Sequence, residues 1–211
     1  MPVRMLSDNQ LLDRVQRETL RYFWEFAHPV CGLALDRSIA GGLGPHAIAV
    51  GGSGFGLMAL IVGVERGWLT AREVLERVET ILAFLEQADH FHGAFPHFLD
   101  GRNGRTIPMT ARDNGGDLVE TAFLMAGLLT LRQYFSKTTL RETAVRDRIT
   151  ALWHRVEWNW YTRGSSGTLY WHWSKDQDWI MDFPVIGWDE CLMTYVLAAG
   201  SPTSPIAKSV Y

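Results

Sequence analysis

Two kinds of helical segment alternate along this chain, and their alternation limits the folds that the chain can adopt. Three segments carry apolar side chains along a single stripe: 8–27, 70–85 and 139–160. Three others are apolar on nearly every side: 54–64, 117–135 and 188–199. A striped helix turns one face to solvent, whereas a helix that is apolar all round must be enclosed by other elements. The predicted order along the chain is therefore an outer helix followed by an inner helix, three times.

Capping residues predict where the three outer helices begin. Ser7–Gln10, Thr70–Glu73 and Thr139–Glu142 each place a hydroxyl residue three positions before a Glu or Gln, which is the pattern of a capping box. In the first of these helices the predicted packing stripe consists of Leu12, Val15, Tyr22, Phe23 and Phe26.

The connections between the helices are unequal in length. Each inner helix leads into the next outer helix through a short polar turn, as expected of antiparallel neighbours. Each outer helix leads into the next inner helix through a long segment: 29–53, 89–116 and 163–187. Because these segments all end where an inner helix begins, we expect them to lie on one face, and loops of that length are usually functional. Asp100-Gly101, Asn103-Gly104 and the polar residues 174–177 predict β-hairpins in two of them.

Three outer and inner pairs correspond to half of a ring of six such pairs. The predicted fold class is therefore all-α, half of an (α/α)6 toroid, with the domain over residues 7–211 and a disordered tail at 1–6. A half ring leaves one side of its inner helices uncovered, which exposes apolar surface of a size normally found at interfaces. We expect a second chain, a second copy or a longer polypeptide to cover that side.

Charge and apolar content exclude several classes of protein. The net charge of -3, without any Lys/Arg cluster, argues against a nucleic-acid binder. The apolar stretch 55–64 is too short to cross a bilayer, so we expect no membrane association. Met1–Ser7 holds no secretory signal, so the sequence as written is that of a cytoplasmic protein, and the localisation itself stays open. Cys31 and Cys191 are expected in the core because two cysteines without CxxC spacing make neither a disulfide framework nor a zinc site.

The densest group of acidic residues lies at the start of the second inner helix. Asp113, Asp117 and Glu120 follow one another at spacings of four and three residues, so Asp117 and Glu120 share one helix face. Carboxyl groups this close cannot all ionise at their ordinary pKa values, and a raised pKa suits a general acid at neutral pH. The alternative is ordinary capping, with Asp117 as the N-cap.

A second acidic group, Gly187-Trp188-Asp189-Glu190-Cys191, occupies the same position before the third inner helix. If the long loops share a face, Glu190 lies opposite Asp117 and Glu120, although Asp189 as a simple cap is the alternative explanation. Two carboxyl groups that flank a cavity are the arrangement used in glycoside hydrolysis, about 6.5–9.5 Å apart for inversion and about 5–5.5 Å apart for retention.

Aromatic and polar residues in the long loops are candidates for sugar binding. Trp171 and Trp173 lie two residues apart in a predicted strand and would project from the same side, although such pairs also serve as core plugs. Flat aromatic rings can stack on the C–H faces of sugars. Four further residues are candidate contacts to hydroxyl groups or rings: Arg37, Ser53, His97 and Trp188.

Metal and cofactor sites are not expected. His90 and His92, close to Asp89 and His97, superficially resemble zinc ligands, but no matched second cluster accompanies them. The sequence has no phosphate-binding loop, and the Gly-rich residues 51–56 contain no lysine.

An ordered series of motifs resembles the bacterial glucoamylase-like domain, the group that contains glycoside hydrolase family 144. The motifs include VGGSGFGLMALIVGVERGW, FHGAFPHFLDGRNGRTIP, DNGGDLVETAFLMAGLLTLRQYF, LYWHWS and GWDECLMTYVLAAGSPTSPI. The resemblance covers almost the whole chain from Leu11 onwards. It implies an (α/α)6 toroid and hydrolysis of β-1,2-glucan with inversion by a protein that is often exported.

The same resemblance implies which acidic residues are essential. They fall on Asp113, Asp117 and Glu120 in DNGGDLVE and on Glu190 in GWDEC. We expect Glu190 to be the general acid, with Asp117 or Glu120 assisting the water. Two alternatives stay open: transglycosylation, as in the related domain of cyclic β-1,2-glucan synthases, and a truncated protein that only binds carbohydrate. Family domains are about twice as long as this chain.

Overall fold

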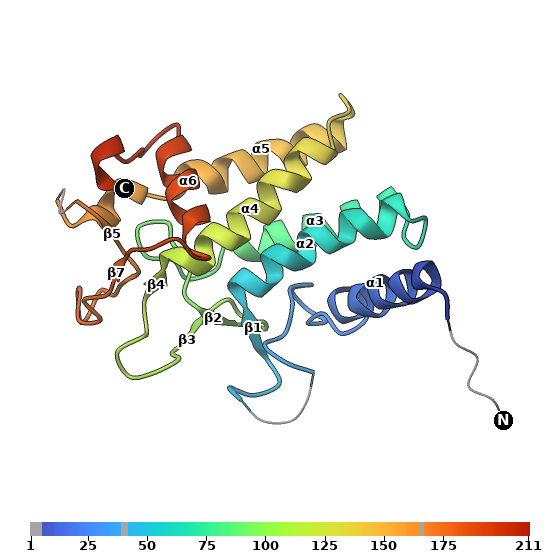
Figure 1. The fold of residues 1–211 in the computed structure, drawn as a ribbon, viewed down its shortest axis with the longest axis horizontal. Helices are drawn as coiled ribbons and strands as arrows, with labels where there is room; N and C mark the ends of the chain where they lie inside the picture. Colours follow the sequence, from blue (N-terminus) through green and yellow to red (C-terminus); the bar gives the residue numbers. More distant parts are fainter. Residues whose placement is uncertain (1–5, 39–41, 165–166) are drawn as a thin grey trace.

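The computed structural model describes residues 6–38, 42–164 and 167–211, and most of the predicted tail at 1–6 lies outside these residues. The described part is mostly helical, as expected of the all-α class (Figure 1). Its α-helices are α1 (Asp8–Trp24), α2 (Val50–Glu65), α3 (Ala71–Leu85), α4 (Leu118–Tyr134), α5 (Leu140–Arg155) and α6 (Leu192–Gly200). Its 3-10 helices are η1 (Trp158–Thr162) and η2 (Lys208–Val210). Its short strands are β1 (Ala47–Ala49), β2 (Phe98–Asp100), β3 (Thr106–Ile107), β4 (Gly116–Asp117), β5 (Leu169–Tyr170), β6 (His172–Trp173) and β7 (Pro184–Val185).

The predicted capping boxes are confirmed for α1 and α3. The side chains of Ser7 and Thr70 each accept from the backbone N–H three residues on. In return, their own backbone N–H groups donate to the side chains of Gln10 and Glu73. At α5, Thr139 caps the N–H of Glu142, but the Glu142 carboxylate accepts from Lys137 N at 2.8 Å instead of closing the box. Helix α5 also ends at Arg155, earlier than predicted, because Val156 adopts an extended conformation.

Two inner helices have different bounds from those predicted. Helix α2 begins at Val50, so the glycines 51–56 belong to the helix and not to the loop before it. Helix α6 begins at Leu192, and the predicted cap Asp189 accepts from Cys191 N at 2.8 Å within a turn that precedes the helix. Glu190 therefore lies on a turn.

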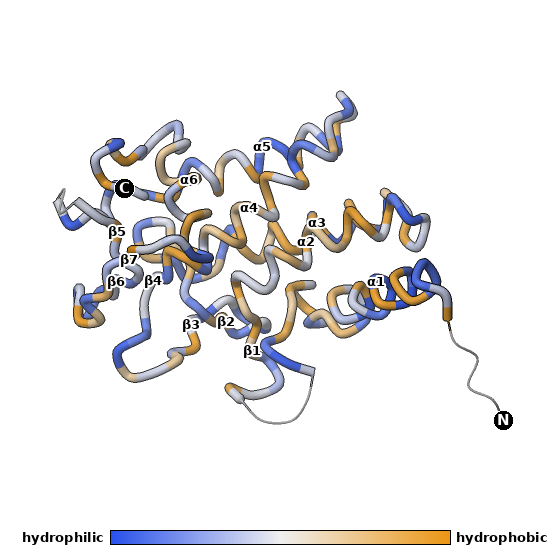
Figure 2. The backbone as a smooth tube through the Cα atoms, in the orientation of Figure 1, coloured by the Kyte–Doolittle hydropathy of each residue, from blue (hydrophilic) through white to orange (hydrophobic). Residues whose placement is uncertain are grey.

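The helices form two rows. Helix α2 packs against α4, and α4 packs against α6, while α1, α3 and α5 pack on their outer side. Figure 2 shows α4 as mainly hydrophobic, whereas α5 alternates between hydrophobic and hydrophilic residues. Helices α2 and α4 approach each other closely at Gly54 and Gly127, where a Cβ on either residue would collide with the backbone of the other helix. The core lies between the two rows.

The predicted packing stripe of α1 is only partly correct. Leu12 and Val15 are 58% and 54% exposed, and Phe26 lies beyond the end of the helix. Leu20 is the buried residue of α1, and the Phe23 ring lies against Gly56 of α2. The helix contacts its neighbour with its C-terminal half, so the apolar residues of its first turns stay exposed.

The inner row also exposes apolar side chains. On α2 these are Phe55 and Val62, and on α6 they are Met193 and Val196, the last of which is 58% exposed. None of the helices within residues 6–38, 42–164 and 167–211 is both long and apolar enough to cross a membrane.

One predicted β-hairpin is confirmed, and the other is confirmed in part. Strands β1, β2 and β3 form an antiparallel sheet, and the turn between β2 and β3 contains the predicted turn dipeptides. The second segment pairs with itself through β5 and β7 and through a bridge between Ser174 and Asp178 across the predicted turn, but β6 between them pairs with β4. Strand β4 leads directly into α4, so this pairing fixes the N-terminus of an inner helix. Figure 1 shows the strands gathered at the end of the molecule where α2 and α4 begin.

Candidate active site

A cavity of about 240 Å³ lies where the long loops meet the beginning of α4. Four polar residues line it: His97, Asp117, Glu120 and Glu190. Five further residues form the rest of the wall: Val119, Trp171, Phe183, Val185 and Cys191. The structure thus brings together three of the four acidic residues that sequence analysis selected.

Asp117 is fully buried and uses both of its carboxylate oxygens. It is the N-cap of α4, and its Oδ1 accepts from Glu120 N at 2.9 Å. Its Oδ2 lies 2.9 Å from His97 Nδ1. Asp117 is thus a cap, as the capping alternative held, and it is also the partner of a cavity residue.

Glu120 reaches from α4 to the first turn of α2. Gly51 N donates to its Oε2 at 2.8 Å, and a Cβ at Gly51 would lie 2.5 Å from this oxygen, so a larger residue there would require the carboxylate to shift. Burial and the neighbouring Asp117 raise the pKa of Glu120. A partly buried carboxyl group with a raised pKa is suited to proton transfer near neutral pH.

His97 shares the cavity with these carboxyl groups. Burial by itself lowers its pKa, but the hydrogen bond to Asp117, together with the charges of Asp117, Glu120 and Asp113, gives a net rise in the pKa. An imidazolium is therefore stabilised at this position.

Glu190 lies on the turn before α6 and lines the same cavity as Asp117 and Glu120 of α4. Its side chain is exposed. Its charge contributes to the raised pKa of Glu120. The predicted meeting of Glu190 with the first acidic group is therefore present in the structure.

Asp113 lies apart from the cavity. Its side chain is 3% exposed, its Oδ1 is 3.6 Å from His172 Nε2, and its Oδ2 has no hydrogen-bond partner among the described residues. Burial and the charge of Asp117 raise its pKa to about 6. His172 Nε2 accepts from Gly115 N at 2.9 Å, so this pair lies against the strand that leads to Asp117. Close spacing in sequence did not place Asp113 among the cavity residues.

The two candidate tryptophans have different surroundings. Trp171 lines the cavity and contacts the edge of Phe183, with the ring centroids 5.8 Å apart. Trp173 is not a lining residue, and its ring instead contacts His92 and Trp160. The predicted common side for both rings fails because the strand is divided: the Trp171 N–H donates to Phe183 O, and only His172 and Trp173 pair with β4.

Three other candidate contacts also lie outside the cavity lining. The Ser53 hydroxyl donates to Ala49 O at 2.7 Å and accepts from Ala34 N at 3.0 Å, so it ties α2 to a loop. Arg37 is exposed and pairs with Asp36 at 2.6 Å. Trp188 is 83% exposed on the turn that carries Glu190.

Sequence analysis did not single out Phe183 or Val185 as binding residues. Their segment was expected to be a hairpin arm, and no sequence signal distinguished a ring that faces a cavity from one that faces the core. Cys191, expected in the core, is partly buried against the core and also lines the cavity.

The histidines considered as zinc ligands have other contacts. His92 Nδ1 lies 2.8 Å from Glu157 Oε2, and its ring stacks on Trp160. His97 pairs with Asp117, as described above. In the parts of the chain that the structure describes, no group of three or more His, Cys, Asp or Glu side chains is arranged to hold a metal ion.

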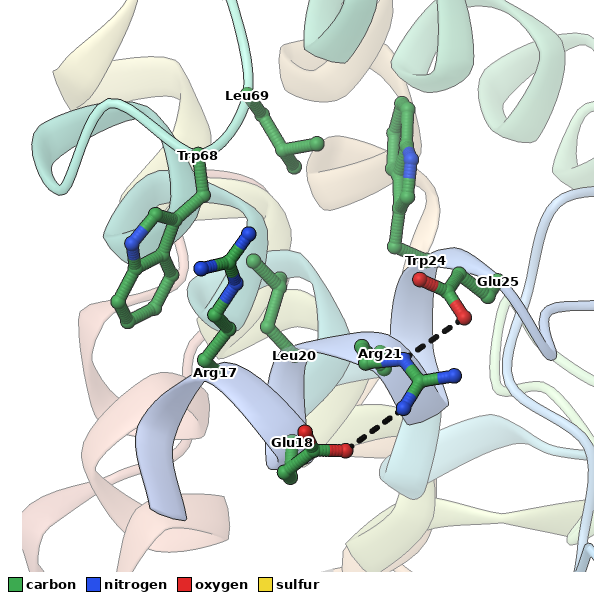
Figure 3. A pocket seen from close by; sticks show the side chains of 8 residues that line it. All are labelled: Arg17, Glu18, Leu20, Arg21, Trp24, Glu25, Trp68 and Leu69. Carbon is green, nitrogen blue, oxygen red and sulfur yellow. Dashed lines mark hydrogen bonds and ion pairs between the residues drawn. The ribbon is translucent and has the colours of Figure 1, made fainter. Parts of the chain in front are cut away.

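A larger cavity of about 480 Å³ lies beside α1 (Figure 3). Trp24, Trp68, Leu20 and Leu69 surround it, and its two carboxylates, Glu18 and Glu25, both bind Arg21 at 2.8 and 2.9 Å. Its carboxylates are exposed and already paired with a cation. The smaller cavity holds the buried Asp117 and the partly buried Glu120, whose pKa is raised, and is therefore the better candidate for acid–base chemistry.

Comparison with known proteins points to one group. A protein of Parabacteroides distasonis named exo β-1,2-glucooligosaccharide sophorohydrolase (non-reducing end) is 48% identical over 208 residues, or 98% of this chain and 28% of that protein. This chain is similar to β-1,2-glucan hydrolases. The endo-β-1,2-glucanase of Chitinophaga pinensis, solved with sophorotriose and glucose, matches with a TM-score of 0.94 and 47% identity over 98% of this chain and 50% of that chain.

A β-1,2-glucanase structure from Parabacteroides distasonis also matches with a TM-score of 0.94 and 47% identity, over 100% of this chain and 30% of that chain. No family model matches. The chain spans about half the length of the Chitinophaga structure and less than a third of the Parabacteroides sophorohydrolase and of the Parabacteroides glucanase structure.

Proposed function

We propose that this chain carries the acidic residues of a glycoside hydrolase that cleaves β-glucan. The proposed substrate is β-1,2-glucan, and the proposed reaction inverts the configuration of the anomeric carbon. The observation that carries the proposal is the single cavity into which Glu120 and Glu190 are brought from separate elements. The similarity to β-1,2-glucan hydrolases supports the choice of substrate.

The occupancy of the carboxylate oxygens supports a division of roles. Glu190 is proposed as the general acid and Glu120 as the residue that assists the water. Asp117 is less suited to the second role because Glu120 N and His97 Nδ1 engage both of its oxygens. Glu120 uses only Oε2 for Gly51 N, so its Oε1 can face the water. Inversion requires about 6.5–9.5 Å between the two groups, to leave room for the water.

Trp171 and Phe183 are proposed to bind the sugar ring. They form an apolar wall beside the carboxyl groups, and their rings meet edge to face. An aromatic ring next to acidic groups can contact the C–H face of a glucose unit while its hydroxyl groups reach the polar side of the cavity. Trp188, on the same turn as Glu190, is proposed as an additional contact on the exposed side.

The complete enzyme is proposed to be a toroid in which a further α-helical half covers the inner row. The exposed apolar residues of α2 and α6 and the twofold length of the Chitinophaga relative both support this proposal. The partner half is polypeptide equivalent to the remainder of that relative, supplied in the same chain or in a second one.

The test supplies linear β-1,2-glucan to this chain joined to its completing half. We expect short oligosaccharides to appear as reducing sugar. Because inversion of a β-linkage gives an α-anomer, NMR should detect the α-anomer of the product first. Glu190→Gln and Glu120→Gln should each lower kcat by about 10²-fold or more, since proton transfer contributes that much. Glu18→Gln, at the remote cavity beside α1, should leave kcat unchanged.

The proposal fails if a folded, complete assembly releases no sugar from any β-glucan. Oligosaccharide binding that persists without turnover and is insensitive to Glu190→Gln would instead indicate a non-catalytic carbohydrate-binding protein.

A further inference from the structure

The contact between Asp117 and His97 is the most tightly enclosed acid–base pair in the cavity. Asp117 is fully buried, and the side chain of His97 is 23% exposed. The pair joins the N-terminus of α4 to residues just before β2, which are far apart in sequence. Its two members therefore meet only in the folded chain.

The Asp117 side chain is 0% exposed, and each of its carboxylate oxygens is engaged by a protein donor. Its Oδ1 caps α4 through Glu120 N, and its Oδ2 binds His97 Nδ1, each at 2.9 Å. A group that works directly on a sugar needs an oxygen aimed at the sugar, and here both oxygens are aimed at protein atoms. The chemistry that Asp117 can influence is thus that of its partner.

The hydrogen bond determines what His97 presents. Because Nδ1 faces the Asp117 carboxylate, Nδ1 carries the hydrogen, and Nε2 is the ring nitrogen left for the cavity that His97 lines. The charged groups around the ring are Asp117 and Glu120 on α4, Asp113 on the loop before β4, and Glu190 on the opposite turn. All of them are acidic, so the surroundings favour the imidazolium form, which would donate through Nε2.

Resting on the proposed function, we infer that Asp117 is a positioning residue that acts through His97, and that His97 is the direct contact, donating from Nε2 to an oxygen of the glucan. Asp117 then does not touch the substrate itself. His97 has a charged, oriented role in place of an incidental hydroxyl contact.

The first experiment measures the protonation of His97 in this chain by ¹⁵N NMR of the imidazole, without any need for activity. In the wild type we expect a titration midpoint above the ordinary histidine value of about 6.5, with the Nδ1–H form in the neutral ring. Asp117→Asn keeps an N-cap side chain, so α4 should persist. The midpoint should fall by about 1 unit or more once the carboxylate is removed.

A matched control is available outside the cavity. His92 and Glu157 form a second His–carboxylate contact of 2.8 Å, so Glu157→Gln should move the His92 signals and leave the midpoint of His97 unchanged. A wild-type His97 midpoint below 6.5 with the Nε2–H neutral form would overturn the inference, and so would a midpoint unaffected by Asp117→Asn.

The second experiment uses the completed, active assembly. If Asp117 acts through His97, Asp117→Asn and His97→Gln should lower kcat/KM to a similar extent. The double variant should then have a kcat/KM no lower than that of the less active single variant. Full additivity of the two effects would contradict the inference. Absence of all turnover would refute the proposed function while leaving the NMR result to judge the pair.

Discussion

Asp113 shows how two acidic residues of one motif can differ in their surroundings. Asp117 satisfies both of its oxygens, whereas Asp113 is almost fully buried with one oxygen unpartnered. The nearby imidazole of His172 does not compensate for this burial, since burial lowers the pKa of His172 and favours the neutral ring. Asp113 is consequently a group whose ionisation the fold opposes.

The raised pKa of Asp113 predicts a dependence of stability on pH. The native pKa of about 6 lies above the ordinary aspartate value of 3.8, so the native state binds the proton more tightly. The contribution to stability is complete below pH 3.8 and is lost as the pH rises through about 6. Asp113→Asn removes this loss, so between pH 4 and pH 7 the variant should gain about 2–3 kcal/mol relative to wild type.

Urea unfolding of both proteins across this pH range measures the effect. Asp147→Asn, at an exposed position of α5, is the control and should show no such trend. A constant stability difference between wild type and Asp113→Asn from pH 4 to pH 7 would show that Asp113 titrates normally.

Among the helices, the contact between α2 and α4 decides the geometry of the site. Glu120 of α4 binds Gly51 of α2, and three residues further on Gly54 brings the two backbones together. A Cβ at Gly54 would collide with the Phe123 carbonyl oxygen, which cannot rotate away as a side chain could. The glycines at the start of α2 thus permit close packing of the two helices, which places Glu120 beside the first turn of α2.

Gly54→Ala should therefore destabilise the fold by about 3 kcal/mol, because the helices must separate to admit the methyl group. Chemical denaturation followed by circular dichroism measures the change. Gly200→Ala is the matched control, since a Cβ at the end of α6 meets nothing within 4 Å. That control should change the stability by no more than about 1 kcal/mol. Equal effects of the two changes would show that the helices are not in close contact at Gly54.

Exposed apolar side chains are distributed over several helices of the molecule. Exposed apolar side chains occur on α1 at one end of the arrangement and on α6 at the other, with those of α2 between them. Single exposed apolar residues are ordinary, but several on successive elements mark an interaction surface. A completing half that covers the inner row would account for them.

The exposure of the α1 stripe can be tested with the double change Leu12→Ser and Val15→Ser. Because both side chains are more than half exposed, each substitution should alter the free energy of unfolding by no more than about 0.5 kcal/mol. Binding of a hydrophobic dye to this chain should decrease. Val78→Ser, at a fully buried position of α3, should instead cost about 2 kcal/mol or more. A comparable loss from the α1 changes would mean that this stripe is packed.

Much of this protein could be predicted from local patterns in its sequence. Apolar periodicity predicted the six helices and their two kinds, and hydroxyl residues predicted where α1 and α3 begin. The spacing of Asp117 and Glu120 placed both at the start of one helix, beside the cavity that Glu190 also lines. These features depend on residues within a few positions of one another, and the period of a helix is the same in any tertiary context.

Only the tertiary structure decided what each side chain contacts. The Ser53 hydroxyl donates to Ala49 O, and the Trp173 ring contacts His92. Trp171 lines the cavity, whereas Asp113 is buried outside it. The pairing of β6 with β4 and the hydrogen bond from His97 to Asp117 join segments that are 20 or more positions apart. Such contacts depend on how whole elements approach one another, and no local pattern encodes that approach. The sequence by itself therefore determined the helices and the acidic residues, and long-range packing determined which carboxylate oxygens remain available for chemistry.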